Sequence, residues 1–212
     1  KGAYTWSKAM NRSDEDGWGD VKWNHPSVLY KNYGPALYDR THIFQLAFVA
    51  ELPFGRDGSG VLAAIIRDWA VNGLVSAFTG PPITTWSPGA SVNAPGNWQS
   101  ADLVGTPVKE GGIGADNPYY DPSAWSPVTE ERFGNTGRST VREPGWWNSI
   151  LGVFRRFPMG RGGLEVRVEA FNLTNTPHFT GLNTNVVSPG FMTITTARPD
   201  ERQVRLGLRV SF

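Results

Sequence analysis

The chain has 212 residues, enough for one domain or for part of a larger one. Its apolar content is only 39%, while 25 glycines and 16 prolines indicate many turns and argue against helices. A formal net charge of +1 gives no reason to expect a nucleic acid or acidic partner. Without cysteine, the chain forms no disulfide or thiolate metal site. It contains no run of about 18 apolar residues that would predict a transmembrane helix.

The first predicted strand covers residues 1–10. Tyr4 and Trp6 share one face with Thr5 between them, because successive side chains of a strand point to opposite faces. A chain that opens on a strand shows no signal peptide. If the protein is exported, we therefore expect its export signal to lie before Lys1.

Two further strands are predicted at residues 42–52 and 67–80. In each, apolar or small side chains occupy alternate positions, and most residues between them are polar or small. The alternate positions are Phe44, Leu46, Phe48, Ala50 and Leu52 in the first strand and Trp69, Val71, Gly73, Val75 and Ala77 in the second. Both segments therefore present one apolar face.

Three strands are predicted in the last third of the chain, at residues 148–157, 163–173 and 202–212. The first has an ambiguous phase, because the apolar residues Ile150 and Leu151 are adjacent. The other two alternate cleanly between an aliphatic face and a charged face. About 9–11 residues is also the length that a tilted strand needs to cross a bilayer.

Short and long connections alternate between these strands. Residues 53–60 and 158–162 are short Gly-rich links, whereas residues 11–41, 81–147 and 174–201 form long loops. Outer-membrane β-barrels have short periplasmic turns and long extracellular loops, while long irregular loops are uncommon in compact soluble domains. The pattern predicts an all-β fold, an antiparallel meander of about six strands from the C-terminal part of a transmembrane outer-membrane β-barrel. Aliphatic side chains would face lipid, and charged ones the lumen.

Six strands are too few to close such a barrel. Unpaired edge groups in lipid each cost several kcal/mol, and the smallest single-chain barrels have about eight strands. We therefore expect residues 1–212 to be an incomplete, C-terminal portion of a larger barrel. Alone, this piece is predicted to aggregate or to require detergent.

Several phrases resemble the barrel of TonB-dependent receptors, specifically the Oar-like branch. The most extensive is residues 167–179, which read Arg-Val-Glu-Ala-Phe-Asn-Leu-Thr-Asn-Thr-Pro-His-Phe. The other phrases are, in chain order, Tyr4–Lys8, Tyr38–His42, Trp69–Gly73, Thr79–Pro82, Asp121–Trp125, Phe133–Arg138 and Arg142–Gly145. The terminal strand resembles the assembly signal of outer-membrane barrels, with Val210 and Phe212 as its last apolar positions. Two positions depart from the family pattern, since Glu143 and Met192 both stand where the family usually has Gly.

The resemblance implies location in the cell outer membrane, contact with its lipid and recognition by the barrel-assembly machinery. It also implies import of a scarce substrate, driven by the TonB energy-coupling complex through a plug domain upstream of these residues. The substrate, whether small molecule, glycan or peptide, is not specified. The resemblance implies no cofactor and no enzymatic activity.

Aromatic residues of the loop at 81–147 are candidate ligand contacts, because exposed rings at a barrel mouth can stack on a sugar or another flat ligand. The candidates are Trp98, Tyr119, Tyr120 and Trp125. Alternatively, these rings pack the loop against itself. The adjacent Trp146 and Trp147 would suit an interfacial aromatic girdle.

Charged residues on the last two strands form the second candidate site. They are Glu165, Arg167, Glu169, Arg205 and Arg209. Either they steer a charged substrate, or they pair with one another and hold the plug against the wall. Because an acidic row lies beside a basic row on neighbouring strands, we expect pairing between the strands.

Evidence for metal or catalytic chemistry is weak. The acidic loop at residues 14–20 could offer oxygen ligands to calcium but lacks the spacing of a calcium-binding helix-loop-helix, which favours a solvated loop. His25, His42 and His178 have no metal-site spacing, and there is no nucleophile elbow or phosphate loop. We therefore expect no metal and no catalytic residue.

The expected function is energy-coupled uptake by an outer-membrane receptor. Two alternatives from other classes are a passive porin or adhesive barrel, which would share this wall but lack a plug, and a soluble carbohydrate-binding β-sandwich with surface tryptophans.

Overall fold

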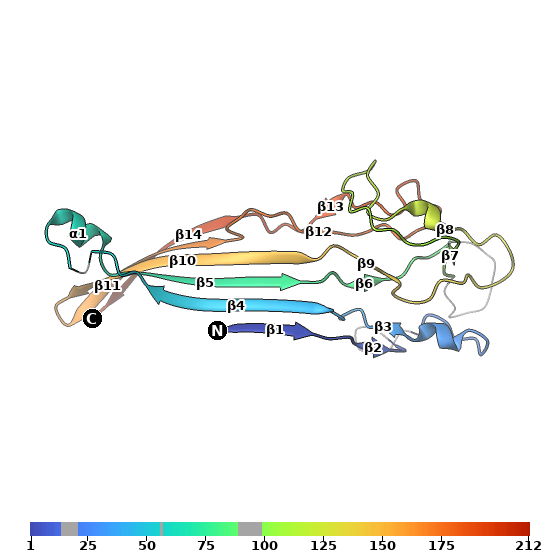
Figure 1. Ribbon diagram of the computed structural model, residues 1–212, viewed down its shortest axis with the longest axis horizontal. Coiled ribbons are helices and arrows are strands. Elements are labelled where there is room, and N and C mark those ends of the chain that lie inside the picture. The colour runs from blue at the N-terminus through green and yellow to red at the C-terminus, as the bar shows by residue number, and fades with distance from the viewer. Residues whose placement is uncertain (14–20, 56, 89–98) are drawn as a thin grey trace.

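A computed structural model describes residues 1–13, 21–55, 57–88 and 99–212. Its main element is one antiparallel sheet whose six strands lie in chain order along the long axis of the molecule (Figure 1). The strands are β1 (Gly2–Trp6), β4 (His42–Glu51), β5 (Trp69–Phe78), β10 (Trp146–Met159), β11 (Gly162–Phe171) and β14 (Gln203–Ser211). The predicted six-stranded meander is confirmed. β1 stops at Trp6 rather than at residue 10, and β10 is longer at both ends than expected.

One face of this sheet, the apolar face, carries apolar side chains from all six strands. The register aligns them in rows across the strands, for example Val71, Val153, Val168 and Leu206. The register also fixes the phase of β10, because Leu151 lies opposite Gly73 on the apolar face. Its neighbour Ile150 therefore belongs to the other face, the polar face.

The apolar face is open to its surroundings. Leu206 and Leu208, in the middle of β14, are 82% and 75% exposed. Outside the main sheet, the described residues form only two-stranded ladders. The β-sandwich alternative needs a second sheet to cover this face, and the described part of the chain does not supply one.

The two short connections lie at one end of the sheet. Gly160 and Arg161 form a two-residue turn between β10 and β11, and Gly160 has a φ of +58° that favours glycine. The connection between β4 and β5 contains a short helix, α1 (Val61–Ile66), after the expected Gly-rich link. The glycine and proline content argues against helices, and no local sequence pattern indicates α1. None of the helices formed by the described residues is long and apolar enough to span a membrane.

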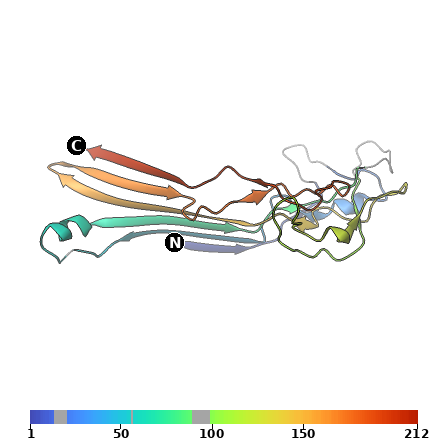
Figure 2. The same ribbon diagram turned by 90° about the horizontal axis from the view of Figure 1, so that it is seen from above.

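The three long connections gather at the opposite end of the sheet (Figures 1 and 2). We call the described residues of 7–41, 79–145 and 172–202 the cap. Its elements are β2 (Met10–Asn11), η1 (Leu29–Asn32), β3 (Gly34–Pro35), β6 (Pro82–Ile83), β7 (Asp102–Leu103), η2 (Pro122–Ala124), β8 (Trp125–Ser126), β9 (Val141–Arg142), β12 (Phe179–Thr180) and β13 (Thr196–Ala197). Each of the ladders β2–β3, β6–β9, β7–β8 and β12–β13 forms within a single one of these connections.

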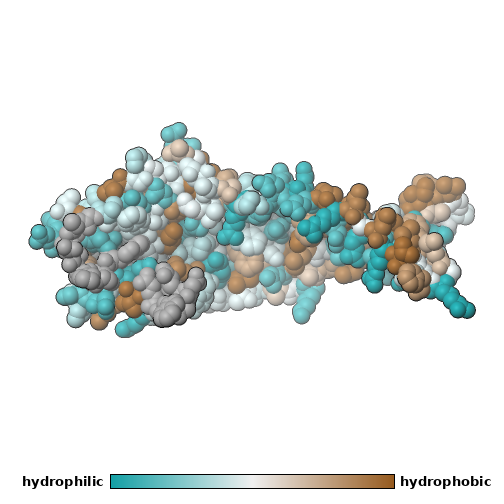
Figure 3. All heavy atoms as spheres, turned by 180° about the vertical axis from the view of Figure 1, so that it is seen from behind, coloured by the Kyte–Doolittle hydropathy of each residue, from teal (hydrophilic) through white to brown (hydrophobic). Residues whose placement is uncertain are grey.

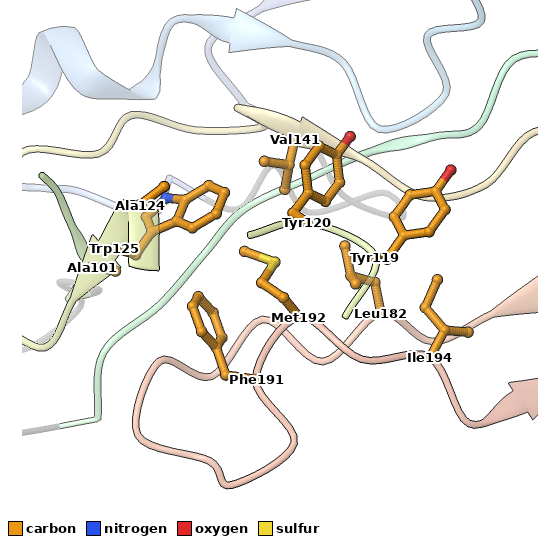
Figure 4. Close-up of a cluster of buried hydrophobic side chains, with 10 residues drawn as sticks. All are labelled: Ala101, Tyr119, Tyr120, Ala124, Trp125, Val141, Leu182, Phe191, Met192 and Ile194. Carbon is orange, nitrogen blue, oxygen red and sulfur yellow. The ribbon is translucent and has the colours of Figure 1, made fainter. Parts of the chain in front are cut away.

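Most of the buried apolar residues lie in the cap and not in the sheet. One cluster, the loop core, comprises Ala101, Tyr119, Tyr120, Ala124, Trp125, Val141, Leu182, Phe191, Met192 and Ile194. Figure 4 shows Met192 in the middle of this cluster. The long loops are thus packed against one another, and they form a structured unit on the end of the sheet.

Candidate functional site

The charged candidates line the polar face of β11 and β14. In the register, Glu165 lies opposite Arg209 and Glu169 opposite Arg205. The ion pairs nevertheless run along β11, because Arg167 contacts Glu165 at 2.9 Å and Glu169 at 3.4 Å. Pairing between the two strands was expected, but Arg167 bridges its two neighbours on the same face of its own strand.

The arginines of this face also lie over aromatic rings. Arg167 is 5.3 Å from the ring centroid of Phe154 on β10, and Arg205 is 4.7 Å from that of Phe171 on β11. Such contacts are favourable because the face of an aromatic ring carries negative charge. Phe154 and Phe171 could not be identified from the sequence, since an aromatic residue on a charged face has no distinctive spacing.

The polar face contains open hollows between these charges. One, of about 230 Å³, is lined by Glu165, Arg167 and Arg209 together with Gly207 and Leu208. A second, of about 100 Å³, lies beside it toward the short turns, next to Arg156 and Ser211. Cations and carboxylates therefore border space that a ligand or another part of a barrel can enter. The geometry is compatible with both substrate steering and plug docking.

The aromatic candidates that the structure describes are buried. Tyr119, Tyr120 and Trp125 are only 5%, 8% and 5% exposed. Their rings meet edge to face, at 5.3 Å between Tyr119 and Tyr120 and 6.3 Å between Tyr120 and Trp125. The prediction that Tyr119, Tyr120 and Trp125 are exposed and stack on a ligand is therefore wrong. Their rings fill the loop core, in the edge-to-face packing that aromatic pairs favour. Trp98 and the acidic loop at 14–20 lie outside the described residues.

The residues of the predicted assembly signal lie at the short-turn end of β14. Val210 is opposite Leu164 on the apolar face, and Phe212 is fully exposed just beyond the strand. Their recognition by the barrel-assembly machinery stays a prediction.

Asp39 and Arg142 form a buried charge pair that joins two loops of the cap. The Asp39 side chain is completely buried, bonds to Arg142 and accepts a hydrogen bond from the Ala9 backbone amide at 2.6 Å. Burial raises the pKa of Asp39, but the Ala9 amide, Arg142 and Arg40 together outweigh it and hold the pKa below its usual value. Both residues lie in phrases that carry the family resemblance, yet nothing in the sequence indicated that they pair.

A second charge cluster lies deeper in the cap, around Asp102. Two nitrogens of the Arg132 guanidinium donate to its carboxylate, at 2.6 and 3.0 Å, and the backbone amide of Asn135 donates to it at 2.9 Å. These contacts lower the pKa of Asp102 despite its burial. Nearby, the buried Lys31 ammonium donates to the Gly134 carbonyl and lies 5.8 Å from the Trp23 ring centroid. This hydrogen bond ties the first long loop to the second, and burial lowers the pKa of Lys31.

The longest family-like phrase forms the junction where β11 leaves the sheet. Asn172, with a φ of +48°, donates to the carbonyls of Thr176 at 3.0 Å and Asp200 at 2.8 Å. His178 is buried, bonds to Asp200 and contacts the Trp147 carbonyl at 2.7 Å. The phrase thus ties the exit of β11 to the start of β10 and to the segment before β14.

Both departures from the family pattern have structural consequences. The Glu143 carboxylate accepts hydrogen bonds from the backbone amides of Gly181 at 3.0 Å and Leu182 at 3.2 Å. Met192 is fully buried and has a φ of +61°, a conformation that favours glycine. In this chain, the two side chains add contacts to the cap that glycine would not make.

Metal ligation finds no support in the part of the chain that the structure describes. Within it, no group of three His, Asp or Glu side chains could hold a metal ion. His178, which sequence spacing also argued against as a ligand, uses both ring nitrogens in protein contacts.

Comparison with known proteins identifies one family. The family model described as "Outer membrane beta barrel domain" matches residues 1–205, nearly the whole chain. No curated protein matches, and no solved structure matches. The match agrees with the six-stranded sheet, its open apolar face and the sorting of short and long connections to opposite ends.

Proposed function

We propose a transport function from the premise that this chain belongs to the outer membrane beta barrel domain family. The protein is located in the outer membrane, and the apolar face of its sheet faces lipid. On this premise, we infer that the chain supplies wall and extracellular cap to a TonB-dependent receptor of the Oar-like type. Such a receptor imports a scarce substrate with energy supplied from the inner membrane.

The observation that carries this proposal is the structural use of the family-like phrases. Asp39 and Arg142, which come from two of these phrases, pair across 103 positions of sequence. Asn172 and His178, from a third phrase, join β10, β11 and the segment before β14. Although each phrase is short, residues from several of them contact one another in the folded cap. These contacts support a common origin with the Oar-like receptors that the phrases resemble.

The charges of the polar face are evidence for a second protein domain inside the barrel that contacts this wall. On this proposal, Arg167 and the two carboxylates that it contacts, Glu165 and Glu169, face the barrel interior, where charges need partners or water. The edges β1 and β14 each pair with only one neighbour in the sheet. In lipid both edges require further strands, supplied by the same polypeptide or by another one. A plug domain inside the completed barrel is the partner that we propose for these charges.

A substrate-independent experiment tests energy coupling. Three strains are compared: the parent, a deletion of this gene and a deletion of the energy-coupling protein. Depletion of compounds from a defined medium is followed by mass spectrometry. We expect at least one compound to persist in both deletion strains and also in the parent treated with a protonophore. A compound that persists only when this gene is deleted would indicate a passive porin. No change in any compound would favour an adhesive barrel.

A further inference from the structure

The short helix α1 exposes a compact set of aliphatic side chains. Val61, Leu62 and Ile65 are 78%, 71% and 58% exposed, and no residue of the helix is charged. Only Ala63 is buried, against a turn so close that a Cβ on Gly58 would lie 2.8 Å from the Ala63 Cβ. Apolar surface of this kind is unfavourable in water, so α1 requires an apolar environment.

The helix is fixed to the lipid-facing side of the sheet. The Trp69 indole donates to the Ile65 carbonyl at 2.9 Å, and the Arg155 guanidinium donates to the same oxygen at 2.8 Å. Trp69 and Arg155 lie opposite each other in the register, on the apolar face. The last turn of α1 is therefore held at the edge of the surface that contacts the membrane.

The surroundings of α1 have the composition of a membrane interface. Trp69 and Phe157 are at this end of the apolar face, and Arg155 lies 4.4 Å from the Phe157 ring centroid. Tryptophan is enriched where acyl chains meet headgroups, and arginine can anchor a segment at that level. Figure 3 shows brown side chains gathered at this end of the molecule, whereas the cap end is mostly white and teal. The exposed side chains of α1 therefore continue an interface that already contacts lipid.

We propose that α1 is a membrane-interface element of the periplasmic leaflet. Its exposed residues Val61, Leu62 and Ile65 lie among the upper acyl chains, and Trp69 and Arg155 hold the helix in that position. The partner is phospholipid. This inference depends on the barrel location of the chain and not on energy-coupled transport, so the two proposals fail separately.

Site-specific fluorescence in a bilayer tests this position. The chain contains no cysteine, which allows single labels, and cysteines elsewhere in the full-length protein are replaced by serine. Leu62→Cys and Ile65→Cys carry an environment-sensitive dye in vesicles of phosphatidylethanolamine and phosphatidylglycerol. Asp57→Cys, in the same connection, is the aqueous reference, and Leu206→Cys is the mid-bilayer reference. Heat-modifiable migration on a gel first confirms that each variant is folded.

The quenching pattern decides the result. Lipids with a nitroxide near the headgroup should lower the emission at positions 62 and 65 by about twofold, with a smaller effect from a nitroxide deep in the acyl chain. Leu206→Cys should show the reverse order, and Asp57→Cys should respond only to aqueous iodide. Iodide quenching at 62 and 65 as strong as at 57 would overturn the proposal. Emission shielded from both iodide and lipid nitroxides would also overturn it, because a protein would then cover the helix.

Discussion

Burial of Asp39 and Asp102 inside the cap is tolerated because each carboxylate has charged and hydrogen-bonding partners. Asp39 is enclosed by the Ala9 amide and Arg142, and Asp102 by Arg132 and the Asn135 amide. A buried carboxylate that loses its cation leaves an uncompensated charge, which costs more than the intact pair contributes. The energetic weight of these residues therefore lies in the penalty for breaking the pair.

Arg142→Ala should destabilise the cap by about 3 kcal/mol at neutral pH, at the low end for a buried pair because the Arg142 side chain is partly exposed. Because the folded pKa of Asp39 lies below its usual value of 3.8, its stabilisation is present above pH 3.8 and is lost as the pH falls through the folded pKa. In the variant, the pKa of Asp39 moves back toward or above 3.8. Acidification should therefore lower the stability of the variant less than that of the parent protein. The measurement is the unfolding temperature of the full-length protein in detergent, followed by tryptophan fluorescence between pH 3 and 7.

The exposed pair of Arg67 and Asp68 provides the matched control. It spans 3.6 Å, and both side chains are at least half exposed. Arg67→Ala should therefore change stability by less than about 0.5 kcal/mol at any pH. Equal losses in Arg142→Ala and Arg67→Ala would show that burial of the Asp39 pair has no special weight.

Met192 combines a strained backbone with a well-filled site. Its φ of +61° costs about 1–2 kcal/mol for a residue other than glycine, but its fully buried side chain fills the loop core. Met192→Gly relieves the strain and leaves a cavity worth about 2–5 kcal/mol. We expect a net loss of about 1–3 kcal/mol, seen as faster proteolysis of the cap. A more stable variant would mean that strain outweighs packing at this position.

At the scale of elements, the sheet could be predicted from the sequence and the cap could not. Most strands display their own period of two, as in Val204, Leu206 and Leu208, and these local patterns predict the meander. Only the phase of β10 stayed open, because Ile150 and Leu151 are adjacent. The contact of Lys31 with the Gly134 carbonyl joins residues 103 positions apart, and no local period encodes it. The rings of Tyr120 and Trp125 were ambiguous for the same reason, since exposed and buried aromatic residues look alike in a loop.

The helix α1 escaped prediction for a different reason. Six residues give fewer than two helical turns, too few to display an amphipathic period. The glycines before it indicated a turn, which is present, and the helix follows this turn. The sequence thus located the connection correctly but could not show its internal structure.

Two glycines of β5 and its exit should respond differently to the same substitution. A Cβ at Gly80 would meet the Glu143 backbone oxygen at 1.8 Å, whereas at Gly73 it would meet the Phe48 ring at 2.5 Å. The Glu143 backbone cannot withdraw without disturbing the adjacent β6–β9 pair, but the partly exposed Phe48 ring can rotate toward lipid. Gly80→Ala should cost about 2–3 kcal/mol and Gly73→Ala less than about 1 kcal/mol. The heat-modifiable fraction recovered from outer membranes measures both, and equal recovery would contradict the predicted asymmetry.

At the scale of the whole molecule, the chain inverts the usual distribution of apolar residues. The sheet exposes an open apolar face, while the buried core lies among loops. A bilayer supplies the apolar environment that a second layer of protein supplies in a soluble fold. The packed cap then closes one end of the sheet, where long loops reach the aqueous phase.

Adjacent residues of β14 test this inversion. Leu206 lies on the apolar face, and its neighbour Gly207 lies on the polar face opposite Arg167, with open space for a side chain. In the assembled barrel, Leu206→Glu should cost about 2 kcal/mol, because a charge at mid-bilayer loses its hydration. Gly207→Glu should be nearly neutral, since the new carboxylate faces Arg167. Heat-modifiable assembly of the full-length protein in phospholipid vesicles measures this difference.

Residues 1–212 alone should reverse the order of these effects. The isolated sheet exposes its apolar face and the unpaired edges of β1 and β14 to water, which favours association. Leu206→Glu removes part of that apolar surface, so it should raise the soluble fraction of the fragment more than Gly207→Glu does. A fragment that is soluble, monomeric and cooperatively folded without detergent would mean that the apolar face is covered by protein. Opposite signs for Leu206→Glu in the barrel and in the fragment require that the same face contacts lipid in one case and water in the other.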